Sequence, residues 1–154
     1  MNKVKQPYHL RISCIAAILS TIFFSASPTF AESASTIQLD VSAFKNNRGT
    51  LICRLFNKAA NFPDGDGILT ENIAIPGPTG SCTFSDIKSG TYAVAVIHDE
   101  NGNGQLDKNF VGMPTEGYGV SNNKTYALSS PKWEESTFAV GTAESKVLQV
   151  KLRY

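Results

Sequence analysis

The sequence predicts an all-β fold, an antiparallel β-sandwich formed by a single domain, and two observations predict it. Apolar and polar residues alternate with a period of two along several short segments, which is the pattern of strands with one buried face. Turns rich in Gly, Pro and Asn separate these segments, and no window of about eleven residues shows a helical repeat with caps. Roughly six or seven short strands of this kind are typical of two stacked sheets.

The expected strands follow in chain order. Alternation is found at residues 37–41, 51–55, 82–84, 138–140 and 148–152. Residues 92–97 are apolar on both faces, as in a central strand that is covered on both sides. Cys53 and Cys82 take inward-facing positions, and two cysteines in an oxidising compartment most simply form one disulfide. We therefore expect a Cys53–Cys82 bridge in or beside the core.

Residues 1–31 have the order of a secretory signal peptide. Lys3, Lys5 and Arg11 precede an uncharged apolar run at residues 12–24, and small residues at 29 and 31 suit signal peptidase. As a helix, that run spans only about 20 Å, short of the ~30 Å of a bilayer core, so a membrane anchor is the poorer interpretation. We expect a cleaved leader, a mature domain at residues 32–154, and a periplasmic, cell-envelope or extracellular location.

The charge balance argues against some partners. Loss of the three basic leader residues takes Lys and Arg from 14 to 11 against 13 acidic residues, a net charge of −2. Such a mild charge does not favour nucleic acid or an anionic membrane surface as a partner. No second apolar stretch is long enough to cross a membrane. A glycan or a protein outside the cell stays open as a partner.

Residues 99–134 stand apart because they alternate little and are rich in Asn and Gly. Connections of this length inside a compact domain are usually functional or disordered. Five aromatic residues lie in or just after the segment, and they favour an ordered loop that packs on the sheets: Phe110, Tyr118, Tyr126, Trp133 and Phe138.

The first nine residues of this segment, 99–107, have a spacing that suits calcium. Oxygen-bearing side chains occupy the first, third, fifth and ninth positions, and Gly104 at the sixth permits a sharp turn. The expected ligands are Asp99, Asn101, Asn103, Gln105 (through its main-chain carbonyl) and Asp107. An EF-hand would have Glu at the twelfth position, where this chain has Phe110, so Glu116 or Glu100 would have to complete the site. A metal-free turn loop is the alternative, because Asn-Gly pairs are ordinary turn formers.

Enzyme chemistry has the least support. His98 is the only histidine after the leader, so a zinc site lacks companions, and no nucleophile motif or phosphate-binding loop is present. At the end of a strand, His98 is expected to be a hydrogen-bonding residue. We expect no catalytic residues.

Two segments, GTYAVAVIHDENGNG at 90–104 and GMPTEGYGVSNN at 112–123, resemble an exported bacterial family of unknown function numbered 2141 (DUF2141). The resemblance extends over nearly the whole mature chain, including Phe62-Pro63 and the final residues 151–154. It implies a sandwich of transthyretin-like or immunoglobulin-like outline, as in accessory or structural modules of exported proteins. It implies no activity, because the family has none assigned and fold does not give function.

The sequence therefore favours a non-catalytic exported module with a calcium-stabilised loop. The alternative is a ligand-binding module in which Tyr118, Tyr126 or Trp133 forms a stacking platform for a carbohydrate or a peptide.

Overall fold

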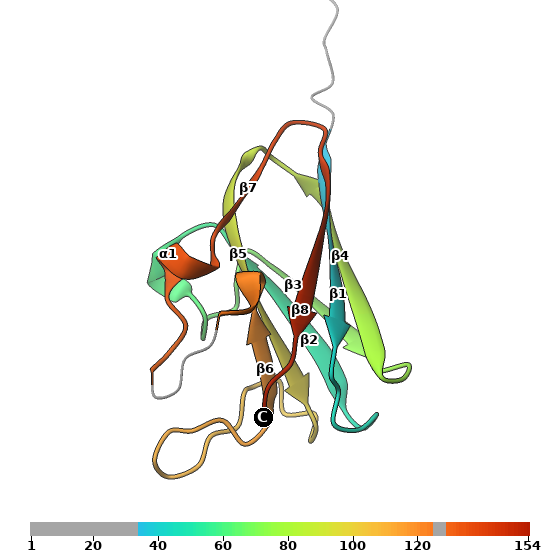
Figure 1. Cartoon of the computed structure of the whole chain (residues 1–154), viewed down its shortest axis with the longest axis vertical. Coiled ribbons are helices and arrows are strands. Elements are labelled where there is room, and N and C mark those ends of the chain that lie inside the picture. The colour runs from blue at the N-terminus through green and yellow to red at the C-terminus, as the bar shows by residue number, and fades with distance from the viewer. Residues whose placement is uncertain (1–33, 125–128) are drawn as a thin grey trace, which may run out of the picture. The chain divides into compact units, whose positions relative to one another are not determined.

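The computed structural model describes residues 34–124 and 129–154, and the predicted signal peptide at 1–31 lies outside the described residues. The described chain is mostly β-structure in two sheets (Figure 1). Its strands are β1 (Ser35–Ser42), β2 (Thr50–Phe56), β3 (Leu69–Ala74), β4 (Thr79–Ile87), β5 (Gly90–Asp99), β6 (Gly117–Val120), β7 (Phe138–Val140) and β8 (Ser145–Lys151). Helical structure in the described ranges is limited to three short turns, η1 (Ala59–Asn61), η2 (Ser121–Asn123) and α1 (Trp133–Ser136).

The strand order separates the two sheets clearly. One sheet has the order β4-β1-β8, and the other has the order β3-β2-β5-β6, with β7 also paired to β5. Strand pairs are antiparallel except β1 and β8, which run parallel. The predicted antiparallel pairing is therefore confirmed for the other strand pairs and wrong for this one. A hairpin forces antiparallel pairing. β1 and β8 are far apart in the sequence, so no hairpin connects them and sets their direction.

The two sheets share one hydrophobic core. Alternate residues of β1, namely Ile37, Leu39 and Val41, are fully buried, as the period-two pattern predicts. The disulfide between Cys53 of β2 and Cys82 of β4 confirms the predicted bridge, and its Cα atoms are 6.5 Å apart. Because β2 and β4 belong to different sheets, this bond crosslinks the two sheets through the core.

Strand β5 is the central strand that the sequence predicts. It lies between β2 and β6, and its outward-facing Ala95 packs in a second, smaller cluster with Phe56 and Val120. Phe62 and Trp133 cover that cluster, and their ring centroids are 5.8 Å apart. Within the described ranges, no helix is long and apolar enough to cross a membrane.

The segment at 99–134 differs from its prediction as one long loop. Its described residues contain β6, η2 and the start of α1, and residues 100–116 form an irregular excursion between β5 and β6. β6 forms because it pairs with β5, although its two glycines give no alternating pattern. The prediction that Phe110 packs on the sheets is also wrong, because Phe110 is 100% exposed in the excursion.

Candidate functional site

The excursion begins at Asp99, whose carboxylate is buried at the end of β5. Its Oδ1 accepts hydrogen bonds from the backbone N–H groups of Gly102 (2.8 Å) and Asn103 (3.1 Å), and its Oδ2 accepts one from Gly104 (2.8 Å). Gly102 and Gly104 have φ values of 78° and 79°, which glycine adopts without steric cost. Three backbone N–H groups therefore compensate the negative charge of Asp99 through hydrogen bonds.

The other predicted side-chain ligands converge on Asp107. The amide nitrogens of Asn101 and Asn103 donate to its two carboxylate oxygens, at 2.7 and 2.9 Å. Their amide oxygens accept backbone N–H groups from Asn103 (3.0 Å) and Gln105 (2.8 Å), which fixes both amide orientations. The structure thus brings the predicted residues together in one hydrogen-bonded loop.

Glu116 closes the base of this loop. It is 5% exposed, and its carboxylate accepts the backbone N–H groups of Glu100 (2.8 Å) and Asp107 (3.1 Å), one on each side of the loop. The Glu100 side chain turns away from the loop, since it contacts Asn46 (2.7 Å) and Arg48 (3.7 Å) in the β1–β2 connection. Of the two carboxylates considered for completing the site, Glu116 is the one that binds the loop itself.

The loop can be tested for its fit to a cation. In the described part of the chain, no three Asp, Glu, His or Cys side chains form a group that could hold a metal. Amide and main-chain oxygens, which make up most of the predicted set, are nevertheless ordinary calcium ligands. Asp99 Oδ2 and the Asn101 and Asn103 amide oxygens each accept one hydrogen bond, which leaves each a second lone pair. These oxygen atoms are of the kinds that bind calcium, and the carboxylate of Asp107 is held by the two amide N–H groups.

His98 lies beside the loop, and both of its ring nitrogens have partners. Nε2 is 2.8 Å from the Arg48 carbonyl oxygen, which can only accept, so Nε2 carries the proton and the Tyr154 hydroxyl donates to Nδ1 at 2.6 Å. Burial raises the pKa of the Tyr154 hydroxyl above its ordinary value of 10.0. This is the hydrogen-bonding role that the sequence predicts for His98.

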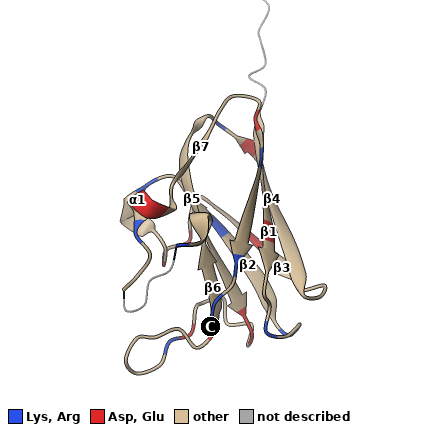
Figure 2. Ribbon diagram, viewed as in Figure 1, with Lys and Arg blue, Asp and Glu red and all other residues tan. Residues whose placement is uncertain are grey.

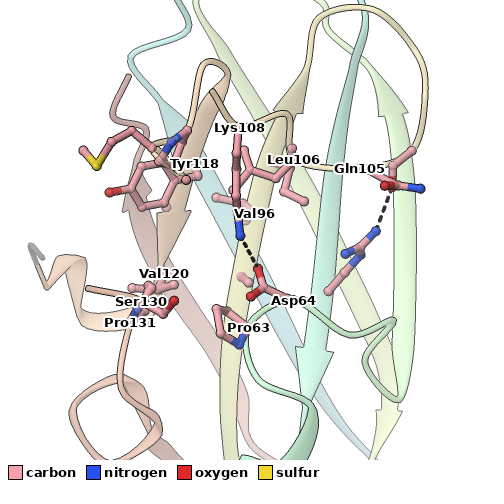
Figure 3. Close-up of a pocket in the computed structure, with 18 of the residues that line it drawn as sticks. Pro63, Asp64, Val96, Gln105, Leu106, Lys108, Tyr118, Val120, Ser130 and Pro131 are labelled. Atoms are coloured by element: carbon pink, nitrogen blue, oxygen red, sulfur yellow. Dashed lines mark hydrogen bonds and ion pairs between the residues drawn. The ribbon is translucent and has the colours of Figure 1, made fainter. Parts of the chain in front are cut away.

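A cavity of about 750 Å³ lies over the outward face of β5 and β6, between the excursion and the β2–β3 connection (Figure 3). The ion pair of Lys108 and Asp64, at 3.3 Å, spans the cavity from one wall to the other. The residues that line the cavity include Arg54, Ala95, Ile97, Lys108, Tyr118 and Val120. This cavity was not predictable from the sequence, because segments distant in the chain form it.

The aromatic residues considered as a stacking platform lie in different surroundings. Tyr118 lines the cavity, but Trp133 packs against Phe62 over the second cluster. Tyr126 lies outside the described residues. Figure 2 shows acidic and basic residues interspersed along the described strands and loops.

Comparison with protein families gives one match. The model of a family described as "Uncharacterized protein conserved in bacteria (DUF2141)" matches residues 39–148. Neither the curated proteins nor the solved structures contain a match to this chain.

Proposed function

This chain belongs to the bacterial family DUF2141, and on that premise we propose that it is an exported, non-catalytic β-sandwich module whose loop at 99–107 binds one calcium ion. The leader-like order of residues 1–31 supports export. The Cys53–Cys82 disulfide agrees with an oxidising compartment. The two facing sheets fit the transthyretin-like or immunoglobulin-like outline.

One observation carries the calcium proposal: Asp99, Asn101, Asn103 and Asp107 are already drawn together around one loop. Asp99 and Asp107 supply two negative charges for a divalent cation, and the amide oxygens and the Gln105 carbonyl supply neutral ligands. Glu116 supports this arrangement from below, because its bonds to the backbone hold the two ends of the loop at a fixed separation.

The ion would act on stability and not on a chemical step. In the structure, two exposed amide hydrogen bonds hold Asp107, and each contributes only about 1 kcal/mol. A bound cation would replace these bonds with direct ligation and would stabilise the folded state by mass action. The non-catalytic proposal is supported by His98, which is fully buried and contacts Tyr154 and the Arg48 carbonyl through its ring nitrogens.

Thermal unfolding with and without calcium tests the proposal. For a Kd of about 10⁻⁴ M, about 10 mM calcium stabilises the folded state by about 2.7 kcal/mol. In a domain of this size that corresponds to a rise in Tm of roughly 8–12 °C. Asp107→Asn should remove most of the rise, whereas Asp66→Asn, an exposed carboxylate on another loop, should keep it. Asp107 is the better residue to substitute, because Asp99 also accepts hydrogen bonds from three backbone N–H groups, and replacing it would disturb the fold of the loop.

Two results would contradict calcium binding. The first is a wild-type Tm that calcium does not change. The second is an equal rise in the wild type and in Asp107→Asn, since a calcium ion bound elsewhere would account for that.

The second candidate function is a ligand-binding module for a carbohydrate or a peptide. The cavity beside Tyr118 favours it, because a ring at the wall of a preformed pocket suits stacking. A glycan array with the wild type and Tyr118→Ala tests this candidate, and binding that is identical in both proteins would exclude Tyr118 as the platform.

A further inference from the structure

The cavity holds a buried positive charge that the sequence analysis missed. Arg54 lies on the outward face of β2, is 9% exposed, and lines the cavity. Its guanidinium donates to the carbonyl oxygens of Gly104 (2.9 Å) and Gly65 (3.4 Å), and its buried Nε has no hydrogen-bond partner. A guanidinium carries five N–H donors, so these two carbonyls leave most of its capacity unused.

Among the residues that the structure describes, no carboxylate pairs with this charge. Across residues 34–124 and 129–154, the ion pairs join other groups, and Arg54 takes part in none of them. Asp64 and Asp66 also line the cavity, but Asp64 is paired with Lys108, and Asp66 is exposed to solvent and forms no ion pair with Arg54. Burying an ion costs several kcal/mol unless an opposite charge compensates it, and two neutral carbonyls compensate it only in part. An anion that enters the cavity would supply the missing partner.

One wall of the cavity is apolar, and this wall would select the other half of the ligand. Ala95 and Ile97 of β5 and Val120 of β6 are apolar and line it over the outward face of the sheet, and the Tyr118 ring adds a further apolar surface. Its volume of about 750 Å³ falls in the range of pockets that enclose small organic ligands. A bare inorganic ion would leave most of this surface unused.

We propose that this cavity binds a small organic anion, a carboxylate with an apolar body, whose acid group pairs with Arg54. The apolar body lies against Ala95, Ile97 and Val120, next to the Tyr118 ring. This site goes beyond the calcium loop and gives the unspecified ligand of the second candidate a definite chemistry. It meets the calcium loop at Gly104, whose carbonyl oxygen accepts from Arg54.

A pair of fluorescent probes tests the charge requirement on the wild type. 8-Anilinonaphthalene-1-sulfonate and N-phenyl-1-naphthylamine differ by one sulfonate, so a difference in their affinities reports recognition of the anion. We expect the sulfonate to bind at least about tenfold more tightly, the effect of a charge-assisted hydrogen bond. Octanoate should displace it, and neutral 1-octanol should not. Equal affinity for the two probes, or equal displacement by octanol, would overturn the proposal.

Variants of the full-length chain, purified after processing by the expression host, test the residue. Arg54→Gln should weaken binding of the sulfonate probe at least about tenfold. Arg48→Gln is the matched control, since it removes one arginine whose side chain is 76% exposed and does not line the cavity. Lys108→Gln should have a smaller effect, because Lys108 already has Asp64 as a partner.

The remaining outcomes also decide the proposal. Unchanged probe affinity in a folded Arg54→Gln protein overturns it, and so does a larger loss in Lys108→Gln than in Arg54→Gln. If Arg54→Gln does not fold, the wild-type probe pair together with a small effect of Lys108→Gln supports it. Each titration is run with calcium and with a chelator, so that absence of calcium binding is distinguished from absence of anion binding.

Discussion

The disulfide between Cys53 and Cys82 gives the most quantitative prediction about this fold. The two residues are 29 positions apart, and closing a loop of that length removes about 12 cal/mol/K of entropy from the unfolded chain. At 25 °C this corresponds to about 3.6 kcal/mol of stability. The double variant Cys53→Ala/Cys82→Ala also deletes two buried sulfur atoms, which adds roughly 1–2 kcal/mol for the cavities that remain.

Denaturation with guanidinium chloride measures this loss. We expect the double variant to be less stable than the wild type by about 5 kcal/mol, a large part of the stability of an ordinary domain. Either single variant should lose nearly as much, because removing one cysteine already breaks the bridge. A loss below about 1 kcal/mol in the double variant would refute the reasoning, as would alkylation of both cysteines in the native, non-reduced protein.

Three further substitutions have defined outcomes. Gly49→Ala should destabilise the fold by more than about 2 kcal/mol in chemical denaturation, because Gly49 has a φ of 73° and an added Cβ would overlap the main-chain oxygen of Asp99. The hydrogen bond from the Gly141 N–H lowers the pKa of the Glu144 carboxyl below 4.5. The stability that the ionised carboxylate contributes is therefore present above pH 4.5 and is lost as pH falls through the lower pKa of the folded state. Glu144→Gln should therefore lower Tm at pH 7 and have little effect in strong acid. Burial raises the pKa of Tyr154, so the wild type should lose stability as pH rises above 10, and Tyr154→Phe should flatten that decline in Tm measured against pH.

The alternation of apolar residues predicted those strands that bury one face. β1 is the clearest case, because Ile37, Leu39 and Val41 point into the core and the residues between them do not. The disulfide was predictable for the same reason, since Cys53 and Cys82 continue the inward pattern of their strands. In both cases one face of the strand is buried, and the order of residues within the segment itself shows this.

β3 and β6 were not predicted, because neither shows the alternation of apolar and polar residues within its own segment. β3 is an edge strand with exposed or partly exposed residues along its whole length, so no buried face imposes a pattern. β6 is short, and Gly119 is needed there for another reason: an added Cβ would lie 2.8 Å from the Val150 side chain. Packing between strands that are distant in sequence, and not a repeat within the segment, specifies β6.

The candidate site divides in the same way. The spacing of Asp99, Asn101, Asn103 and Asp107 predicted their convergence, because one tight turn is enough to produce it. Arg54 instead sits at an outward, polar position of its strand, where the sequence indicates exposure. It is buried because the β2–β3 connection and the excursion after β5 both fold over that face, and no short-range pattern encodes this.

Gly104 joins the two proposed sites through its own backbone groups. Its N–H donates to Asp99 Oδ2, and its carbonyl oxygen accepts from Arg54 Nη2, so one residue holds both a carboxylate and a guanidinium in place. A cation that orders the loop would therefore also fix a wall of the cavity and one of the hydrogen-bond acceptors of Arg54. Thermodynamic linkage then requires reciprocity: the factor by which calcium tightens binding of the sulfonate probe must equal the factor by which the probe tightens binding of calcium. If both ligands bind with affinities independent of one another, the ion does not order the wall of the cavity, and the coupling inferred through Gly104 is wrong.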